Sequence, residues 1–412
     1  MRPHYEGLWL NALSRTVLVP ASKRCTIIFN PKSACSTLKF NIWQQEYESG
    51  AAERAPPSKG GAVHRNTDTP IPKIPMEEME AALFGSPVFS LVRNPYARIL
   101  SSYLQKITTN RKQKRHLLLG MGRELNESVT FGEFVDYISR QNSREMDRHY
   151  TPQALLMQVN YLPFAKIGCV ERTEESIAAI TASVYGTVPK AVSEYRHHRT
   201  DAPSRIGEYY TPEIAEKVLH RFRMDFEIFG YSSDIGEAHL PPQNLEGAAQ
   251  LGREASESVL RPAIRAAVAE EHNDDSAALQ LLSSIKSDEP ELDAARARLL
   301  FKMKREEEAV ALLQRVVERV DDVGRYWMQL AECLQALGRS RESVDAADKA
   351  VAIAPYPGLM RRAARTWQNA GEKTKASALM NKLTSILETS PKRRKETSPK
   401  KRKRLELAGA GD

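Results

Sequence analysis

The chain has 412 residues, which is more than one typical domain, and 41% of them are hydrophobic, enough for a sizeable core. Its net charge of +8 is unevenly spread, because nine Lys and Arg residues against four Asp and Glu residues lie in 386–412. The rest of the chain is close to neutral, so the composition does not require a basic globular face. The four cysteines lack paired spacing, which speaks against a disulfide framework and a zinc site.

The sequence gives no sign of a membrane span or an export signal. No segment reaches the roughly 20 apolar residues that a membrane-spanning helix needs. Residues 1–24 are interrupted by Asn11, Ser14, Arg15 and Pro20, so they lack the unbroken apolar centre of a signal peptide. We therefore expect a soluble protein in the cytoplasm, with its cysteines reduced.

The first half of the chain alternates strand and helix patterns. Short runs rich in Val, Ile and Phe predict strands at 25–29 and 88–92, and 165–170 is a weaker candidate. Helical patterns follow the first two runs, at 37–47 and 96–106. Strand followed by helix, repeated, predicts parallel strands joined by crossover helices.

Residues 27–39, IIFNPKSACSTLK, pass from an apolar strand through small polar residues into a helix. The first backbone N–H groups of a helix have no partners within it, so they favour an anion. Lys32 would add positive charge there, and the small residues after it would let a phosphate approach. No glycine lies between residues 25 and 49, so the long loop of triphosphate-binding proteins is absent and a shorter anion fits better.

Residues 89–103, FSLVRNPYARILSSY, again pass from a strand to a helix. Arg93 stands at the strand end, and Pro95 fits the first helical turn. Arg93 and Ser101 would then contact one phosphate from two sides, with the fork geometry of an arginine. Arg98 lies in the same turns, where a structural ion pair explains it at least as well as a ligand contact.

Together these segments resemble the carbohydrate sulfotransferases of the Golgi and their bacterial relatives. Pro31 and Lys32, with the small residues after them, resemble the family's 5′-phosphosulfate loop, and 93–103 resembles its 3′-phosphate motif. The resemblance covers roughly residues 25–231 and continues, in the family's order, in 149–153 (HYTPQ), 167–171 (IGCVE) and 225–231 (DFEIFGY). The Golgi members have a membrane anchor and lumenal disulfides that are not visible here, so a cytoplasmic bacterial enzyme fits better.

The resemblance implies an α/β fold of the P-loop nucleotide-kinase type, in which a parallel sheet is flanked by helices. It implies in-line transfer of a sulfuryl group from 3′-phosphoadenosine 5′-phosphosulfate (PAPS) to a hydroxyl of a carbohydrate or glycoconjugate, without a metal. Lys32 would offset the charge that builds on the leaving phosphate oxygen. The implied donor-binding residues are Pro31, Lys32, Ser33, Ala34, Cys35, Ser36, Thr37, Arg93 and Ser101.

The transfer needs a base for the acceptor hydroxyl, and its working pKa favours a histidine or a carboxylate. His64 lies between the two donor motifs, in the interval where related carbohydrate enzymes place a catalytic histidine, and we favour it. His149 competes with it, although its motif would also serve to lock a turn or to shape the acceptor cleft. The alternative explanations are a surface histidine in a long loop for His64 and a hydrogen-bonded core histidine for His149.

The second half of the chain is rich in Ala, Leu, Glu and Arg, with almost no strand signal. Residues 305–310 align with 339–344 at a shift of 34, and Gly338 aligns with Gly371 at a shift of 33. The best unit resembles the tetratricopeptide consensus, so we expect an all-α repeat domain, with a generic helical bundle as the alternative. The repeats would offer a surface to a protein partner.

The patterns divide the chain into four segments: a sulfotransferase domain (1–235), a linker (236–246), helical repeats (247–387) and a basic disordered tail (388–412). The tail cannot bury apolar area, and we interpret it as solvated rather than as a specific nucleic-acid site. Two other functions remain open. A nucleotide-dependent kinase would need the missing glycine loop, and an inactive transferase-like scaffold that binds partners through its repeats would have no need of Lys32, Arg93 and Ser101.

Overall fold

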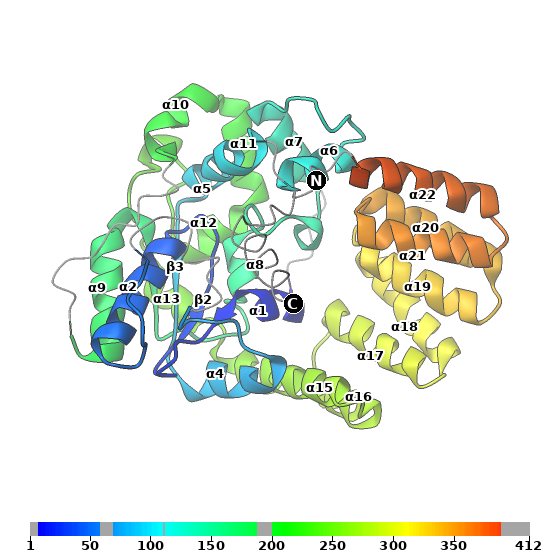
Figure 1. Cartoon of the computed structure of the whole chain (residues 1–412), viewed down its shortest axis with the longest axis horizontal. Helices are drawn as coiled ribbons and strands as arrows, with labels where there is room; N and C mark the ends of the chain where they lie inside the picture. The colour runs from blue at the N-terminus through cyan, green and yellow to red at the C-terminus, as the bar shows by residue number, and fades with distance from the viewer. Residues whose placement is uncertain (1–6, 58–68, 110–111, 188–199, 389–412) are drawn as a thin grey trace, which may run out of the picture.

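The structure is a computed structural model, and it describes residues 7–57, 69–109, 112–187 and 200–388. Figure 1 shows an α/β part that contains the sheet and, beside it, an array of helices coloured yellow to red. The architecture is the one that the sequence predicts, a mostly parallel sheet flanked by helices and followed by an all-α region.

The sheet has four strands in the order β1 (Val17–Leu18), β2 (Thr26–Ile28), β3 (Val88–Val92) and β4 (Lys166–Cys169). β2, β3 and β4 are parallel, and β1 is an antiparallel edge strand. The three predicted strands are confirmed, whereas β1, with two residues, is too short to leave a pattern in the sequence. Because the strands are parallel, the segments that follow β2, β3 and β4 meet at one edge of the sheet.

The sheet is covered on both faces, as parallel sheets usually are. All five residues of β3 are buried. Phe89 and Leu91 belong to the core cluster formed with α2 (Cys35–Glu48) and α9 (Thr173–Tyr185), whereas Val88 and Val92 belong to the larger core on the opposite face. This alternation follows from the two-residue period of a strand.

The predicted helix at 37–47 lies within α2, and the one at 96–106 consists of α5 (Pro95–Ser102) and a π-helical turn, Tyr103–Ile107. Asn94 caps α5 by accepting a hydrogen bond from the Tyr96 N–H, with Pro95 in the first turn. The other helices of the α/β part are α1 (Leu10–Thr16), α4 (Met79–Gly85), α6 (Lys112–Gly120), α7 (Phe131–Arg140), α8 (Gln153–Met157), α10 (Ile206–Tyr209), α11 (Pro212–Arg221), α12 (Arg223–Phe229) and α13 (Leu245–Gln250).

The helical array consists of pairs that repeat at the predicted interval. Its helices begin at residues 290, 324 and 357 and at residues 306, 340 and 373, so each pair starts 34 and then 33 residues after the one before it. The helices are α17 (Pro290–Lys302), α18 (Glu306–Arg319), α19 (Gly324–Ala336), α20 (Ser340–Ile353), α21 (Pro357–Asn369) and α22 (Lys373–Glu388). Ala331, Ala347 and Ala350 are fully buried, which is where small residues let neighbouring helices approach.

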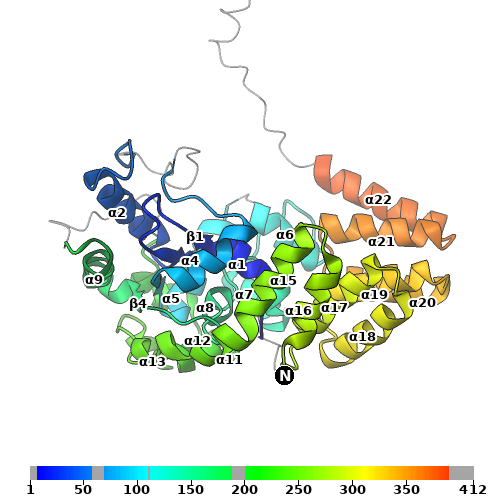
Figure 2. The same cartoon turned by 90° about the horizontal axis from the view of Figure 1, so that it is seen from below.

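The larger core does not stop at the α/β part. It includes Ala238, Leu260 and Leu282 and runs on to Leu299 in α17, so it crosses the predicted linker. Figure 2 shows α15 (Arg261–Glu271) and α16 (Asp275–Ser284) between the sheet and the array. Within the described residues, no helix combines the length and hydropathy needed to cross a membrane. Residues 389–412 of the predicted tail lie outside the described residues.

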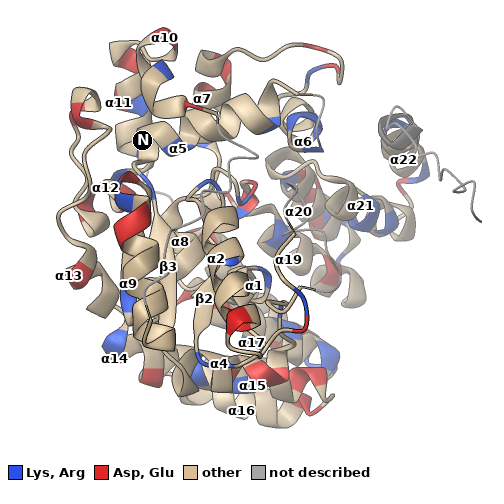
Figure 3. Cartoon of the chain, turned by 60° about the vertical axis from the view of Figure 1, so that its left-hand side comes forward, with Lys and Arg blue, Asp and Glu red and all other residues tan. Residues whose placement is uncertain are grey.

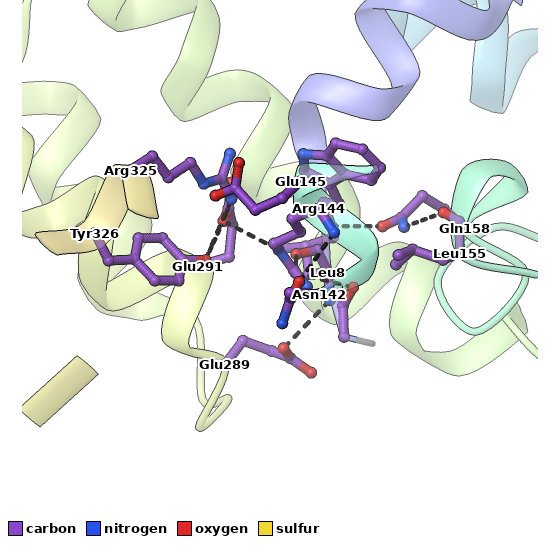
Figure 4. Close-up of polar contacts among 12 residues, drawn as sticks. Leu8, Asn142, Arg144, Glu145, Leu155, Gln158, Glu289, Glu291, Arg325 and Tyr326 are labelled. Carbon is purple, nitrogen blue, oxygen red and sulfur yellow. Dashed lines mark hydrogen bonds and ion pairs between the residues drawn. The ribbon is translucent and has the colours of Figure 1, made fainter. Parts of the chain in front are cut away.

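A buried polar network joins the α/β part to the array (Figure 4). Arg144 donates a hydrogen bond of 2.5 Å to the Leu8 carbonyl oxygen, and its Nε lies 3.8 Å from Glu291 Oε2 in α17. The same carboxylate accepts hydrogen bonds from Arg325 and, at 2.6 Å, from the Tyr326 hydroxyl. Glu291 therefore neutralises one arginine from each part of the chain.

Further hydrogen bonds join the two parts of the chain around Glu291. The Gly324 N–H, at the start of α19, donates to Glu145 Oε1 at 2.9 Å, and Asn142 Nδ2 donates to Asp322 Oδ1 at 2.8 Å. The Leu8 N–H donates to Glu289 Oε2 at 3.2 Å. The segment that carries His149 is thus anchored at its beginning to the helical array.

We expect Glu291→Gln to lower the free energy of unfolding by about 3 kcal/mol, because it leaves two arginines without their buried counter-charge. Urea denaturation would measure this loss. Glu342→Gln is the matched control, since Glu342 pairs with Arg339 at 2.6 Å on the surface. It should cost about 0.5 kcal/mol, and an equal loss in both variants would contradict this account of the junction.

Candidate active site

The turn between β2 and α2 forms without glycine by using two residues with positive φ. Lys32 has φ +73° and Ala34 has φ +49°, a region that non-glycine residues rarely adopt. Such turns direct successive backbone N–H groups into a concavity that suits an anion. Lys32 and Ala34 thus take up left-handed conformations that glycines adopt at less cost, a feature that the sequence did not reveal.

Lys32 and Arg93 lie together at the carboxyl edge of the sheet. Arg93 Nη1 donates to the Lys32 carbonyl oxygen at 3.3 Å, and Lys32 Nζ donates to Gln105 Oε1 at 3.0 Å. Burial, reinforced by the charge of Arg93, lowers the pKa of Lys32 to about 7. An anion bound here would relieve the repulsion between the two cations and restore the charge of the amine.

Arg98 has a structural role, and among the described residues it binds backbone carbonyl oxygens rather than forming an ion pair. It is fully buried and donates to the carbonyl oxygens of Pro31 (3.1 Å) and Thr151 (2.8 Å). A third contact reaches the Arg148 carbonyl oxygen at 3.4 Å. Arg98 therefore ties the loop after β2 to the segment that carries His149.

Gln153 connects the two predicted donor motifs through one buried amide. Its Oε1 accepts hydrogen bonds from Asn30 Nδ2 (3.0 Å), the Ser33 hydroxyl (2.9 Å) and the Arg93 N–H (2.9 Å). Its Nε2 donates to the Arg93 carbonyl oxygen at 2.8 Å. The side chain is fully buried, so these hydrogen bonds do not compete with water. The relative position of the Lys32 loop and Arg93 is set by this amide.

Two carboxylates hold the surrounding backbone. Asp225 accepts from the N–H groups of Gln153 (2.9 Å) and Ala154 (2.8 Å), at the start of α8. Glu171 accepts from the Asn94 N–H at 2.8 Å and from the Tyr231 hydroxyl at 3.0 Å. The motifs 167–171 and 225–231, noted only for their resemblance, thus support the turn that carries Arg93.

The other predicted donor residues surround the same turn. Cys35 opens α2, with Ser36 and Thr37 in its first turn, and burial raises the pKa of the Cys35 thiol. Ser101 is buried in α5, and its Oγ lies 2.8 Å from Thr200 Oγ1. Ser33 donates its hydroxyl to Gln153, so it supports the loop rather than facing a ligand.

His149 is held by a carboxylate that the sequence reasoning missed. Its Nδ1 lies 2.5 Å from Asp147 Oδ1, and its backbone N–H donates to the same oxygen at 3.0 Å. Burial, reinforced by the charges of Lys106 and Arg148, lowers the pKa of His149 although Asp147 opposes this shift. Burial alone would raise the pKa of Asp147, but the bond to His149 lowers it to about 2. His64 lies outside the described residues.

The described residues contain no group of three or more His, Cys, Asp or Glu side chains that could hold a metal ion. All four cysteines lie in the described residues and are free thiols. The site thus combines cations, backbone N–H groups and a histidine paired with an aspartate, an arrangement that can bind an anion and accept a proton.

A model of the sulfotransferase family matches residues 22–232. The chain belongs to the sulfotransferase family. Carbohydrate sulfotransferase 14 of Danio rerio is 26% identical over 234 residues, which cover 53% of this chain and 63% of that protein. The Homo sapiens protein of the same name is 24% identical over 240 residues, with coverage of 53% and 61%. The chain therefore spans less than two thirds of the length of these relatives.

Among solved structures, MamA from Desulfovibrio magneticus RS-1 is similar, with 14% identity and a TM-score of 0.31. The similarity covers 43% of this chain and 94% of that one. A second MamA structure, from AMB-1, has 18% identity and a TM-score of 0.29, covering 32% and 79%. These TM-scores are too low to bear on function.

We expect Gln153→Leu to lower the free energy of unfolding by about 3 kcal/mol, because buried donors on both motifs lose their acceptor. The affinity of the Gln153→Leu variant for adenosine 3′,5′-bisphosphate should fall at least about tenfold, because the two motifs are no longer held in position. Calorimetry at a temperature where the variant is folded would measure this affinity.

Gln158→Leu is the matched control. Gln158 follows the same helix, is 2% exposed and accepts from the Trp9 N–H at 2.7 Å. This variant should lose stability and keep its affinity for the bisphosphate. If Gln153→Leu also keeps that affinity, the amide does not position the two motifs.

Proposed function

We propose that this sulfotransferase moves a sulfuryl group from PAPS to a hydroxyl of a carbohydrate or glycoconjugate. The observation that carries the proposal is that Lys32 and Arg93 follow neighbouring strands and lie together. Arg93 donates a hydrogen bond to the Lys32 carbonyl oxygen, and the Gln153 amide holds both segments in place. The short glycine-free turn favours a monophosphate-sulfate anhydride over a triphosphate. Carbohydrate sulfotransferases among the relatives support the acceptor class.

In the proposed reaction the acceptor oxygen attacks the sulfur atom while the bond between sulfur and the bridging phosphate oxygen breaks. The electron pair of that bond passes to the phosphate oxygen, and adenosine 3′,5′-bisphosphate leaves. Lys32 and the N–H groups of the turn offset the new negative charge. Arg93 and Ser101 hold the 3′-phosphate, which distinguishes PAPS from ordinary adenine nucleotides.

The acceptor proton goes to a histidine. His149 suits this role because Asp147 fixes the ring through Nδ1, so that Nε2 is the nitrogen left to accept a proton. Its lowered pKa keeps it neutral at pH 7, as a base must be. His64 remains the other candidate, and the two are separated by experiment below.

The proposed transfer uses no metal, since the positive charge of Lys32 offsets the negative charge that forms on the leaving group.

The last parts of the proposal concern the location of the protein and its partners. Four free thiols favour a cytoplasmic location in a bacterial cell. The helical array would bind a protein partner in addition to supporting the junction with the α/β part. An inactive scaffold and an ATP-dependent kinase are the alternatives that the next experiment separates from a sulfotransferase.

Transfer of labelled sulfate from PAPS to a panel of glycans should fall about 10²–10³-fold in Lys32→Ala, because one preorganised charge at the leaving group is lost. The melting temperature should not fall, since the removed amine is buried beside a cation. Lys166→Ala, an exposed lysine at the opposite end of β4, is the control with full activity.

The same assay tests the alternatives. An undiminished rate in Lys32→Ala would show that Lys32 has no part in the transfer. Calorimetry with adenosine 3′,5′-bisphosphate and ATP identifies a kinase if only ATP binds, and an inactive scaffold if neither binds.

The pH dependence of kcat/KM for PAPS should be bell-shaped. A base must be neutral, so the rate rises with pH through the pKa of His149, which lies below the usual 6.5. Lys32 must be charged, so the rate falls as the pH passes its pKa of about 7 in the free enzyme. His149→Ala should abolish the acidic limb and leave affinity for the bisphosphate intact. Loss of that limb in His64→Ala alone would identify His64 as the base.

A further inference from the structure

One face of α5 and of the π-helical turn after it contacts both halves of the candidate site. Arg98 donates to the Pro31 carbonyl oxygen at 3.1 Å, and Ser102 Oγ lies 2.5 Å from the His149 carbonyl oxygen. Gln105 follows at the next position of the i, i+4, i+7 spacing, so the three side chains share one helical face. Figure 3 shows α5 above the ends of β2 and β3, with lysines and arginines in blue.

Gln105 is the residue of this face that reaches the Lys32 amine. The half-buried amide accepts a hydrogen bond from Lys32 Nζ through Oε1 at 3.0 Å. Among the described residues the amine has no carboxylate partner. A hydrogen-bond acceptor favours the charged form of an amine, so Gln105 opposes the loss of the Lys32 proton that burial promotes. The contact also fixes the direction of the amine.

The backbone that carries Gln105 is held rigidly. It is the π-helical turn Tyr103–Ile107, a rare form of helix that is frequent at functional sites. The Tyr103 hydroxyl donates to the Val129 carbonyl oxygen at 2.8 Å, and its ring centre lies 5.2 Å from that of Phe131. Gln105 therefore projects from an anchored element, as a residue that orients another side chain should.

The titratable groups around the Lys32 amine come from several elements, and they are Cys35 in α2, Arg93 after β3, Arg98 in α5 and Lys106 in the π-helical turn. Burial and, after it, the three cations lower the pKa of Lys32. Burial raises the pKa of the Cys35 thiol, which therefore stays neutral at pH 7. A substitution of Gln105 leaves all four groups in place, so its effect on Lys32 can be read separately from theirs.

We propose that Gln105 is a positioning residue for the transfer, one that keeps the Lys32 amine protonated and directed at the leaving phosphate oxygen. The inference rests on the proposed function and adds a residue that acts through Lys32. A neutral amide suits this task better than a carboxylate, because a negative charge beside Lys32 would repel the anionic donor.

Gln105→Leu should lower kcat for sulfuryl transfer from PAPS at least about tenfold, because the amine loses the group that directs it. KM for PAPS should change by less than about threefold, since the amine and the N–H groups of the turn remain. The basic limb of the pH profile of kcat/KM should move to lower pH, because loss of the acceptor disfavours the charged amine.

Gln105→Glu tests the sign of this effect. The carboxylate has nearly the shape of the amide and favours the charged amine, so the basic limb should move to higher pH by at least about one unit. KM for PAPS should rise through repulsion of the donor. Thr108→Val is the control, because the exposed Thr108 hydroxyl donates to the Leu104 carbonyl oxygen at 2.7 Å in the same segment. This variant should keep the wild-type kcat and both limbs.

Labelling of Lys32 with acetic anhydride over a pH series, read by mass spectrometry, measures its protonation without PAPS. Lys32 should react at lower pH in Gln105→Leu than in the wild type, and at higher pH in Gln105→Glu. Identical labelling curves would overturn the inference, as would a fall in kcat with limbs that do not move. If the wild-type chain transfers no sulfuryl group but the curves shift as expected, the proposed function fails and the control of Lys32 by Gln105 stands.

Discussion

The geometry of the site depends on the buried amide of Gln153. One oxygen accepts hydrogen bonds from the loop after β2 and from the backbone after β3, so two segments that are distant in sequence share one acceptor. Asp225 fixes the start of the helix that carries the amide. A parallel sheet brings strand ends together, but it does not fix the loops that follow them. Here a polar side chain does so, in a place where water does not compete.

The sheet and its helices could be predicted because each strand is a short apolar run and each following helix has its own pattern. The repeat period could be predicted because the helices of the array begin at matching positions, 34 and then 33 residues apart. β1 could not be predicted, since two residues form no pattern and its pairing with β2 depends on the fold. The positive φ values at Lys32 and Ala34 could not be predicted either, because neither residue is the glycine that usually marks such a turn.

The closeness of Lys32 and Arg93 could be predicted, because each follows a strand of the same parallel sheet. Their role in binding an anion stays a prediction. The partners of these residues could not be predicted. Gln105 and Gln153 contact segments that are distant in sequence, and Asp147 forms a hydrogen bond that only the folded turn creates. Sequence spacing offered one weak sign, the aspartate two positions before His149. The role of Arg98 was open between ion pair and ligand contact, and its carbonyl partners show a third kind of role.

The larger core crosses the predicted linker and ends only in α17, where Glu291 meets an arginine from each side of the junction. Dissection of the protein at residue 246 would therefore expose the apolar face that α15 and α16 cover, and a fragment made this way would aggregate or unfold. A shortened chain would have to retain α19 and its partner α20, so that Arg144 keeps Glu291 and the neighbours Arg325 and Tyr326. The last helix pair, α21–α22, could then be exchanged or extended as a module, as stacked repeats generally allow.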